Sequence, residues 1–462
     1  MQLYIFLKIL FLLLPIIIVL IKDKEFRLYN PALILSIIYF FEFGLSSIYM
    51  IIDPSLLDNT DIGLEELNTG LVFIDLVIVF FLLGYYSSYF NPTIKNLTTV
   101  LCKKIPSLSA YELNIKNMPL LLLILLFVGW ISRIILFSAG AYYHTEVDVN
   151  PIITIPKFKL ISQIIGNGSI FPIVALNLCF VEWMKKKGIN YLLSSLVMLA
   201  VEILYALPSG SKERIVFPVL LIIFLYSLKS KLPVLPLSTG IFFFVFFVFP
   251  FVSIYRSIYL TGNINIDIPK TFALYQDLFG GFNLNVLNGI LTNLFAERLN
   301  YAHIVSVIVN YTPYVWDFKL GFTYLFFLIS LIPRIFWPGK PDISFYMNDF
   351  GRDYGFLHPS DFTTSIDMTW VGEMFINFGW FGILVAFAYG WFYQIIYSYF
   401  CRFNKMTTLT AILYALLLYY MVRGGTFTIQ FGGVIKTLFV IILIFYPFMR
   451  KKNKTRGKDI SG

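Results

Sequence analysis

Apolar residues in this sequence fall into blocks of about twenty, and this spacing limits the possible fold more than any other feature. A helix needs about twenty residues to cross the roughly 30 Å hydrocarbon core of a membrane. Only 13% of the residues are charged and 58% are hydrophobic, whereas a soluble domain has about 25% charged residues. The sequence therefore predicts an all-α protein, a polytopic transmembrane helical bundle.

Eleven segments have the length and composition of spans, and one further apolar block, Leu320 to Phe336, is ambiguous. The eleven segments are Leu3 to Ile21, Ala32 to Ile52, Leu71 to Phe90, Met118 to Phe137, Leu160 to Val181, Tyr191 to Leu207, Ile215 to Leu228, Val234 to Tyr255, Met374 to Tyr399, Thr408 to Val422 and Val434 to Phe448. Met1 to Leu20 has no small-residue cleavage pattern, so we expect it to be retained as the first span. We therefore expect about 11–12 spans.

Four regions follow from this pattern: N-terminal transmembrane helices (1–255), a large extracytoplasmic region (256–371), C-terminal transmembrane helices (372–449) and a basic cytoplasmic tail (450–462). The ambiguous block predicts a membrane-embedded helix near 320–336 inside the extracytoplasmic region. The alternative is that this block is paired with a second crossing near Ala302 to Val309.

Lysine and arginine divide the connecting loops into two sets. The basic loops contain Lys22, Lys24 and Arg27; Lys95, Lys103, Lys104 and Lys116; Lys185 to Lys187; Lys229 and Lys231; and Arg402 and Lys405. Basic loops remain in the cytoplasm, so the acidic or neutral loops that alternate with them face outwards. The net charge of +9 is thus explained by topology, and we expect no nucleic-acid partner.

Arginine departs from this rule, because seven of the eleven arginines map to the predicted outer face: Arg133, Arg214, Arg256, Arg298, Arg334, Arg352 and Arg423. The planar guanidinium suits bidentate binding of phosphate oxygens and stays charged when it is partly desolvated. The cluster therefore indicates an anionic ligand at the outer membrane surface, such as a lipid-linked pyrophosphate. The alternative is that each arginine contacts lipid headgroups or pairs with a nearby carboxylate, such as Glu213 for Arg214.

Proton-transfer candidates also fall on the predicted outer segments. The histidines there are His144, His303 and His358, and the carboxylates are Asp277, Glu297, Asp342, Asp349, Asp353, Asp361, Asp367 and Glu373. No pair of them has metal-binding spacing, so we expect metal-independent chemistry. Aromatic residues that can stack on sugar rings are Phe279, Phe282, Tyr354, Phe356 and Trp370, although aromatic residues are also common at membrane interfaces.

Three short stretches have patterns more specific than a generic loop. From Ile332 to Pro341, three prolines stiffen the chain around Arg334 and Lys340. From Gly372 to Gly382, Glu373 and Asn377 lie one turn apart on one helical face. From Leu207 to Arg214, a tight turn presents Lys212 and Arg214.

At these residues the chain resembles the bacterial Wzy-type oligosaccharide repeat-unit polymerases, which build O-antigen and capsular polysaccharides. Such families show a small-residue turn with a basic residue, a Pro-Arg and Trp-Pro-x-Lys-Pro segment, and a Glu followed by Asn-Phe-Gly. The matching segments here are Ser209 to Arg214, Pro333 to Pro341 and Glu373 to Gly379. The turn reads Gly-Ser-Lys-Glu-Arg, which leaves open whether Lys212 or Arg214 is the functional cation.

The resemblance implies a GT-C-like glycosyltransferase of the bacterial cytoplasmic membrane, with its active site on the periplasmic side and without a cofactor. Such an enzyme transfers a growing glycan from undecaprenyl pyrophosphate to the non-reducing end of an incoming lipid-linked repeat unit. A chain-length regulator and a flippase are its expected partners. An O-antigen ligase and, in a different class, a lipid-linked oligosaccharide flippase are the alternatives.

The leaving pyrophosphate gains negative charge in the transition state, so fixed cations would stabilise it. We expect Arg256, Arg334 and Lys340 to form that clamp, with Arg334 acting directly in catalysis, and Arg133, Arg214 and Arg423 as further candidates. Either Glu373 or His358 would take the proton of the acceptor hydroxyl. Asn377, Tyr354 and Trp370 are the expected substrate contacts.

Overall fold

The computed structural model describes residues 2–23, 26–52, 62–139, 164–259, 300–341, 343–403 and 406–451, together with residues 273, 275, 276 and 289. These residues are mainly α-helical. The helices are α1 (Gln2–Phe11), α2 (Leu14–Asp23), α3 (Pro31–Tyr39), α4 (Ser46–Ile52), α5 (Leu64–Phe90), α6 (Pro92–Lys104), α7 (Met118–Ser138), α10 (Phe171–Lys186), α11 (Ile189–Ala206), α12 (Lys212–Ser227), α13 (Val234–Phe243), α14 (Phe249–Tyr259), α17 (Tyr301–Tyr311), α18 (Phe322–Leu331), α19 (Ile343–Asp353), α20 (Thr369–Phe378), α21 (Gly382–Tyr397), α22 (Thr408–Val422) and α23 (Gly433–Phe445). Strands β1 (Tyr111–Leu113) and β2 (Met449–Lys451) form one antiparallel pair.

Nine helices in the described part of the chain are long and apolar enough to cross a membrane. They are Ile5–Asp23, Pro31–Ile52, Leu64–Phe90, Met118–Ser138, Ile164–Lys186, Ile189–Ser209, Leu235–Tyr255, Thr369–Phe403 and Thr428–Phe448. Each coincides with a span that the sequence predicts. The remaining two predicted spans are the shorter helices α12, with 16 residues, and α22, with 15 residues. The protein is thus an all-α, multi-pass membrane protein.

The ambiguous apolar block near residues 320–336 forms helix α18, which has only 10 residues. Helix α17, at the place of the alternative second crossing, has 11 residues. At 1.5 Å per residue each helix is roughly 15 Å long, about half of the hydrocarbon thickness. Most of α17 is buried and packs against α5 and α20. Neither helix is therefore long enough to cross the membrane by itself.

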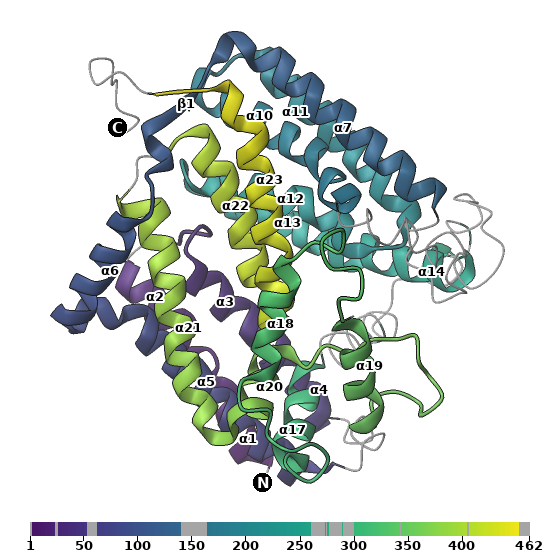
Figure 1. Cartoon of the computed structure of the whole chain (residues 1–462). Helices are drawn as coiled ribbons and strands as arrows, with labels where there is room; N and C mark the ends of the chain where they lie inside the picture. The colour runs from purple at the N-terminus through teal and green to yellow at the C-terminus, as the bar shows by residue number, and fades with distance from the viewer. Residues whose placement is uncertain are drawn as a thin grey trace.

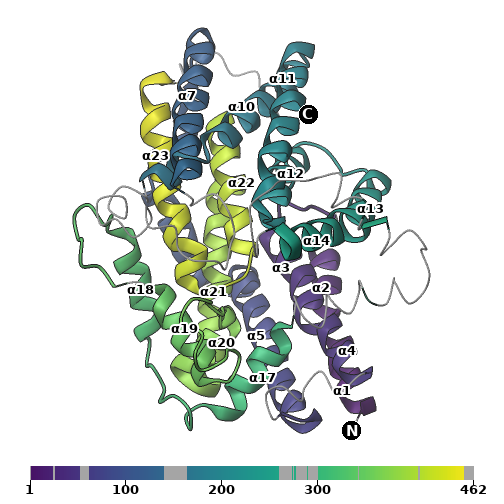
Figure 2. The ribbon, with the colours of Figure 1, turned by 90° about the vertical axis from the view of Figure 1, so that its right-hand side faces the viewer.

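Helix α22 lies at the centre of the bundle. Figure 1 shows α1, α5 and α21 in the lower half of the molecule and α7 and α11 in the upper half, with α22 and α23 between them. The view in Figure 2 shows the same order. Helix α22 contacts α3 as well as α10 and α12, and nearly all of its residues are buried. It therefore joins the N-terminal helices to the helices that follow β1.

The packing of α5 against α21 depends on glycine. A Cβ atom on Gly84 would lie 1.9 Å from the carbonyl oxygen of Phe387, and one on Gly390 would lie 1.9 Å from that of Phe81. No other residue fits at either position without moving a backbone. Small residues permit such close approach in membrane helices, where packing contacts take over the role that the hydrophobic effect has in water.

Segments that the charge pattern places on the same side of the membrane meet in the structure. Strand β1 lies in the predicted cytoplasmic loop before α7, and it pairs with β2 at the start of the predicted cytoplasmic tail. Lys185 donates a hydrogen bond to Thr408, which lies at the start of α22, and Lys229 donates one to the carbonyl of Met184. The basic loops thus gather at one end of the helices.

Candidate functional site

Two adjoining cavities lie beside the first turns of α12. The first, here the Arg133 cavity, has a volume of about 280 Å³, and its polar lining comes from Arg133, Asn167, Ser169, Glu202, Arg214 and Thr437. The second, here the Arg423 cavity, has a volume of about 360 Å³ and is lined by Ser211, Glu213, Arg214, Phe217, Tyr419, Tyr420 and Arg423. The cavities share Arg214, Phe217 and Tyr420. Three of the seven outer arginines therefore lie around one connected region.

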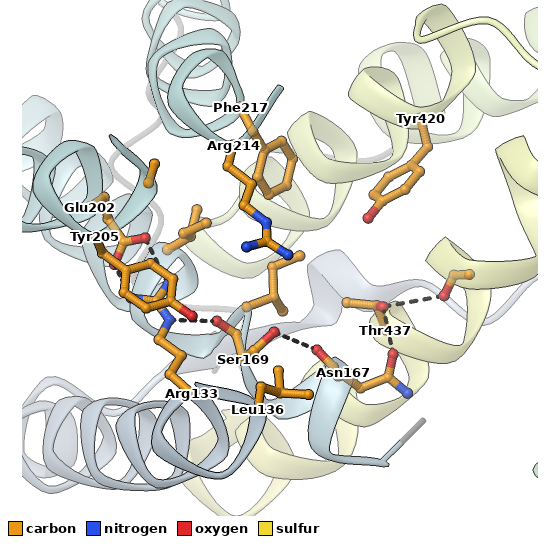
Figure 3. Close-up of a pocket in the computed structure, with 15 residues that line it drawn as sticks. Arg133, Leu136, Asn167, Ser169, Glu202, Tyr205, Arg214, Phe217, Tyr420 and Thr437 are labelled. Carbon is orange, nitrogen blue, oxygen red and sulfur yellow. Dashed lines mark hydrogen bonds and ion pairs between the residues drawn. The ribbon is translucent and has the colours of Figure 1, made fainter. Parts of the chain in front are cut away.

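The turn before α12 directs its two cations to different places. Gly210 takes the left-handed conformation at a φ of 67°, and the Ser209 hydroxyl donates to the carbonyl of Ala206 and accepts from the N–H of Ser211. Helix α12 then begins at Lys212. The Lys212 ammonium lies 3.3 Å from the centre of the Phe249 ring, whereas the exposed Arg214 points into the Arg133 cavity (Figure 3). Arg214 is therefore the cation of this turn that faces the cavities.

The start of α12 also favours an anion by itself. The first N–H groups of a helix have no partner within the helix and carry partial positive charge. Ser211, the residue that precedes the helix, makes no side-chain capping hydrogen bond and lines the Arg423 cavity. An anion in this cavity would meet both the helix terminus and two guanidinium groups.

Arg133 is a buried partner of Glu202 at the wall of the first cavity. Its two terminal nitrogens donate to the two Glu202 oxygens at 2.8 and 2.7 Å, and its Nε donates to the carbonyl of Ser169 at 3.0 Å. The guanidinium lies 4.9 Å from the ring centre of Trp130 and 4.2 Å from that of Tyr205. Both charged groups are almost fully buried. Arg133 therefore fixes the cavity wall through an ion pair between α7 and α11.

A break in the fifth span supplies further polar groups to the same cavity. The helix that contains Gly166 is interrupted before α10 begins at Phe171, which leaves the carbonyl of Ser169 for Arg133. The Asn167 side chain accepts a hydrogen bond from Thr437 at 3.2 Å (Figure 3). A Cβ atom on Gly168 would lie 2.3 Å from the Ser132 hydroxyl, so a larger residue would displace that side chain. The glycine-rich break thus forms part of the polar wall of the Arg133 cavity.

Arg423 lies at the end of α22 and forms an ion pair with Glu213. The sequence had suggested Arg214 as the partner of that carboxylate. The Nε of Arg423 is 3.0 Å from Oε1 of Glu213, and the same oxygen accepts a hydrogen bond from the Tyr419 hydroxyl at 2.7 Å. The side chains of Arg423 and Glu213 are 36% and 46% exposed. The pair is therefore open to the cavity, and the guanidinium keeps terminal nitrogens that can bind a ligand.

Glu373 holds the chain segment that follows Arg423. Its side chain is buried, Oε1 accepts from the Thr323 hydroxyl at 2.8 Å, and Oε2 accepts from the N–H of Phe427 at 2.7 Å. Helices α18 and α20 are thereby tied to the turn between α22 and α23. Glu373 is not among the described residues that line either cavity. It can therefore position Arg423 only through the chain segment that it holds.

Asn377 has a similar structural position one turn later. It is fully buried, donates to the Thr323 hydroxyl and the Glu373 carbonyl at 2.7 Å each, and accepts from the N–H of Gly321 at 2.8 Å. Gly321 has a positive φ of 93° at the start of α18. Asn377 therefore stabilises the turn that enters α18.

Asp367, just before α20, completes the charged groups near Arg423. Its Oδ1 accepts from the N–H of Thr369 at 2.9 Å. Burial raises the pKa of Asp367 to about 6, although N–H donors from Thr369 and Thr426 and the charge of Arg423 oppose the change. The folded protein thus favours the neutral form of this carboxyl group at mildly acidic pH.

Replacing Asp367 by asparagine is expected to raise stability at neutral pH. A raised pKa means that the stabilisation from this group is present below the unfolded pKa, near 4, and is lost as the pH rises through about 6. The amide stays neutral, so the difference in stability between Asp367→Asn and the wild type should grow by on the order of 2 kcal/mol from about pH 4.5 to about pH 7.5. Thermal unfolding in detergent at both pH values measures it, and an equal difference at both would contradict the assignment.

The proline-rich segment folds back on the end of α18. The Lys340 ammonium donates to the carbonyls of Ser330 and Ile332 at 3.1 and 3.0 Å, and Arg334 donates to the carbonyl of Lys340 at 2.8 Å. Both side chains are buried. Lys436 of α23 donates to the same Ser330 carbonyl at 2.9 Å. These cations therefore cap a helix terminus, where positive charge is favoured, and lie apart from the residues that line the two cavities.

The other expected site residues are distributed around the bundle. Trp370 is buried and stacks on Tyr389 at 5.5 Å, and the buried Tyr354 shares a 2.8 Å hydrogen bond with Thr312. His358 is exposed and bonds to Ser360 at 2.6 Å through Nδ1. None of these three expected residues is among the described residues that line the cavities.

Several expected residues lie outside the described part of the chain: His144, Asp277, Phe279, Phe282, Glu297, Arg298 and Asp342. Arg256 lies on α14, but its side chain is outside the description as well. Arg352 is described, and its Nε donates to Asn348 at 2.9 Å while the guanidinium lies 4.3 Å from the Phe362 ring centre. Arg352 therefore stabilises α19 and the loop after it.

Sequence reasoning missed Glu202 and Tyr420, which line the cavities, and Glu42, which lies beside the turn after Arg423. Glu42 and Glu202 carried a usable signal, because a carboxylate inside a membrane span is functional by default. Tyr420 carried none, since tyrosine is common in such helices. Among the described residues, no group of three histidine, cysteine or acidic side chains is arranged to hold a metal ion.

Comparison with known proteins places this region within a family. The model of a family described as a domain of unknown function (DUF8712) matches residues 131–454, a range that includes every residue lining the two cavities. No curated protein and no solved structure matches the chain.

Proposed function

The chain belongs to the DUF8712 family, and we propose that it is a polysaccharide polymerase of the bacterial cytoplasmic membrane. In this proposal it transfers a growing glycan from undecaprenyl pyrophosphate to an incoming lipid-linked repeat unit for O-antigen or capsule. The reaction takes place at the extracytoplasmic ends of the spans. A flippase that supplies the lipid-linked units and a chain-length regulator are the proposed partner proteins.

The observation that carries the proposal is the position of Arg214, which lines both cavities at the first turn of α12. Arg423 lines one of the two cavities together with it. Two exposed guanidinium groups and a helix N-terminus form a site for an anion with several oxygens, and pyrophosphate is such an anion. As the glycosidic bond to the carrier breaks, these fixed positive groups stabilise the charge that develops on the leaving pyrophosphate.

The surroundings of this site suit a lipid-linked donor. The cavities lie among helices of a multi-pass bundle, so the carrier chain can remain in the bilayer while its pyrophosphate reaches the arginines. Arg133 is buried, and both of its terminal nitrogens already donate to Glu202. Arg214 and Arg423 are therefore the cations on which the proposal depends.

Transport of the lipid-linked units is the second candidate function, because ionisable residues also lie within the membrane-spanning helices α1 and α5. Lys8 of α1 donates to Asn68 at 2.7 Å, and Oδ1 of Asp75 in α5 is buried without a hydrogen-bond partner among the described residues. Intramembrane ionisable residues mark ion pathways in many transporters. A flippase would move such units without forming a glycosidic bond.

Gel analysis of surface polysaccharide tests the proposal in a strain from which this gene is deleted. The expected result is loss of the ladder of long chains, with single repeat units still attached to their surface acceptor, and restoration by the wild-type gene. Purified protein mixed with the lipid-linked repeat unit should then extend it and release undecaprenyl pyrophosphate.

Two other outcomes would overturn the proposal. Repeat units that accumulate on the carrier at the outer surface, with none attached to the acceptor, indicate a ligase. Units that accumulate on the carrier at the cytoplasmic face indicate a flippase. Protection of the carrier-linked glycan from an added glycosidase in intact spheroplasts separates these two results.

A further inference from the structure

Glu42 lies in an unusual part of the second span. It belongs to a π-helical turn, Phe40–Leu45, inside the continuous helix Pro31–Ile52. Such turns widen a helix locally and frequently occur at functional sites. The side chain is half-buried, and within the described part of the chain no hydrogen-bond donor reaches its carboxylate.

The Glu42 carboxylate lies against the residue that follows Arg423. A Cβ atom on Gly424 would be 3.5 Å from Oε1 of Glu42, and one on Gly425 would be 2.7 Å from Oδ2 of Asp367. Both glycines have positive φ, at 84° and 88°. The two carboxylates therefore face successive residues of the turn that follows Arg423, which itself lines the Arg423 cavity.

The same charged groups surround one tyrosine of a third segment. Glu42, Asp367, Arg423 and Glu213 all act electrostatically on the hydroxyl of Tyr301, at the start of α17. Tyr39, on the same span as Glu42, is also under the electrostatic influence of Glu42. Of the three carboxylates near Tyr301, Glu213 and Asp367 each accept at least one hydrogen bond. Glu42 accepts none from the described residues.

Transfer onto a sugar hydroxyl requires a proton acceptor, and the two candidates from the sequence are not placed for it. Both oxygens of Glu373 are occupied by Thr323 and Phe427, and the side chain is buried. His358 bonds to Ser360 on an exposed loop. A general base must come within hydrogen-bond distance of the hydroxyl, directly or through one water molecule.

We infer that Glu42 is the general base that accepts the proton of the attacking hydroxyl, an inference that rests on the proposed polymerase function. The acceptor oxygen forms a bond to the anomeric carbon of the donor sugar while the bond from that carbon to the phosphate oxygen breaks. The electron pair of the broken bond leaves with undecaprenyl pyrophosphate, beside Arg423 and Arg214. The hydroxyl proton moves to Glu42 and later to water. Asp367 holds the Gly424–Gly425 turn and acts as a positioning residue.

The test is the initial rate of chain extension by purified, detergent-solubilised Glu42→Gln with a lipid-linked repeat unit. Loss of a general base lowers rates by about 10²- to 10⁴-fold. We expect kcat to fall by at least about 100-fold while KM stays within a few-fold, because the pyrophosphate site is intact. The wild-type rate should fall on the acidic side of its pH profile, and the residual rate of the variant should not show that fall.

Two variants serve as controls. Glu65→Gln changes an exposed carboxylate in the first turn of α5, far from the Arg423 turn in the chain, and should keep the wild-type rate. Glu42→Asp keeps the carboxyl group and should retain more activity than glutamine, which a purely structural role would not predict. Size-exclusion profiles and melting temperatures of all variants identify any that are misfolded.

The results separate this inference from the proposed function. If the wild type extends the repeat unit and folded Glu42→Gln does so equally well, Glu42 is not the base, whereas the polymerase proposal stands. If wild-type turnover requires an added divalent cation and Glu42→Gln raises the concentration needed, Glu42 is a metal ligand and the inference is overturned. If the wild type forms no product with any lipid-linked repeat unit, the proposed function itself fails.

Discussion

The Arg214→Ala substitution is expected to lower the rate of chain extension at least about 100-fold. Arg214 lines both cavities at the first turn of α12, so its loss removes the cation that the two cavities share. Removing one fixed group that stabilises developing negative charge costs on the order of 10²- to 10³-fold in rate, or about 3–4 kcal/mol. The measurement is the initial rate of product formation by purified protein, together with the ladder in the complemented deletion strain.

Lys212 provides a matched control for this prediction, because it lies two residues earlier on the same turn. Its ammonium lies over the Phe249 ring, so Lys212→Ala should keep activity within a few-fold. Arg214→Lys keeps the charge but loses the bidentate geometry and should be intermediate. Full activity of folded Arg214→Ala, or equal losses in both alanine variants, would show that the cavities are not the pyrophosphate site.

Removal of Arg133 is expected to cause the largest loss of stability among single substitutions at the site. Arg133→Ala leaves the Glu202 carboxylate buried without the two hydrogen bonds that it accepts at 2.8 and 2.7 Å. Breaking a buried ion pair by removing one partner costs about 3–5 kcal/mol. The free energy of unfolding, measured by denaturant titration in mixed micelles, should fall by that amount.

A double variant separates the cost of an unpaired charge from the value of the pair itself. Arg133→Met with Glu202→Met replaces both charges by apolar side chains of similar length, and such replacements are often neutral or stabilising. Arg450→Ala breaks the exposed pair with Glu112, whose side chains are 60% and 40% exposed, and should cost at most about 1 kcal/mol. If Arg133→Ala costs no more than Arg450→Ala, Arg133 does not stabilise the fold through its pair with Glu202.

The membrane-spanning architecture was predictable from the sequence because its cause is local. Each span needs about twenty apolar residues in succession, and the free energy of insertion is the sum of contributions from those residues. The nine long helices therefore coincide with predicted spans, and α12 and α22 are the two others. The block near residues 320–336 was ambiguous because α18 is apolar but has only 10 residues, and it packs on the bundle with one side exposed.

The candidate site was predictable only as residue types. The excess of outer arginines pointed to an anionic ligand, and the turn before α12 was singled out for its two cations. Which cation faces the cavities depended on Phe249, 37 positions after Lys212 in the sequence numbering. The pairing of Glu213 was equally non-local, because its partner is Arg423 and not its neighbour Arg214.

The sequence by itself determined that this chain is a helical membrane protein, where most of its spans lie, and that arginine gathers towards the predicted outer ends. Only the tertiary structure decided that Arg214 and Arg423 share a cavity, that Glu202 pairs with Arg133, and that Glu42 faces the turn after Arg423. The physical reason is the range of the forces involved. Burial in lipid acts on each helix separately, whereas ion pairs and hydrogen bonds require atoms within about 3–4 Å, and that proximity exists only after distant helices have packed together.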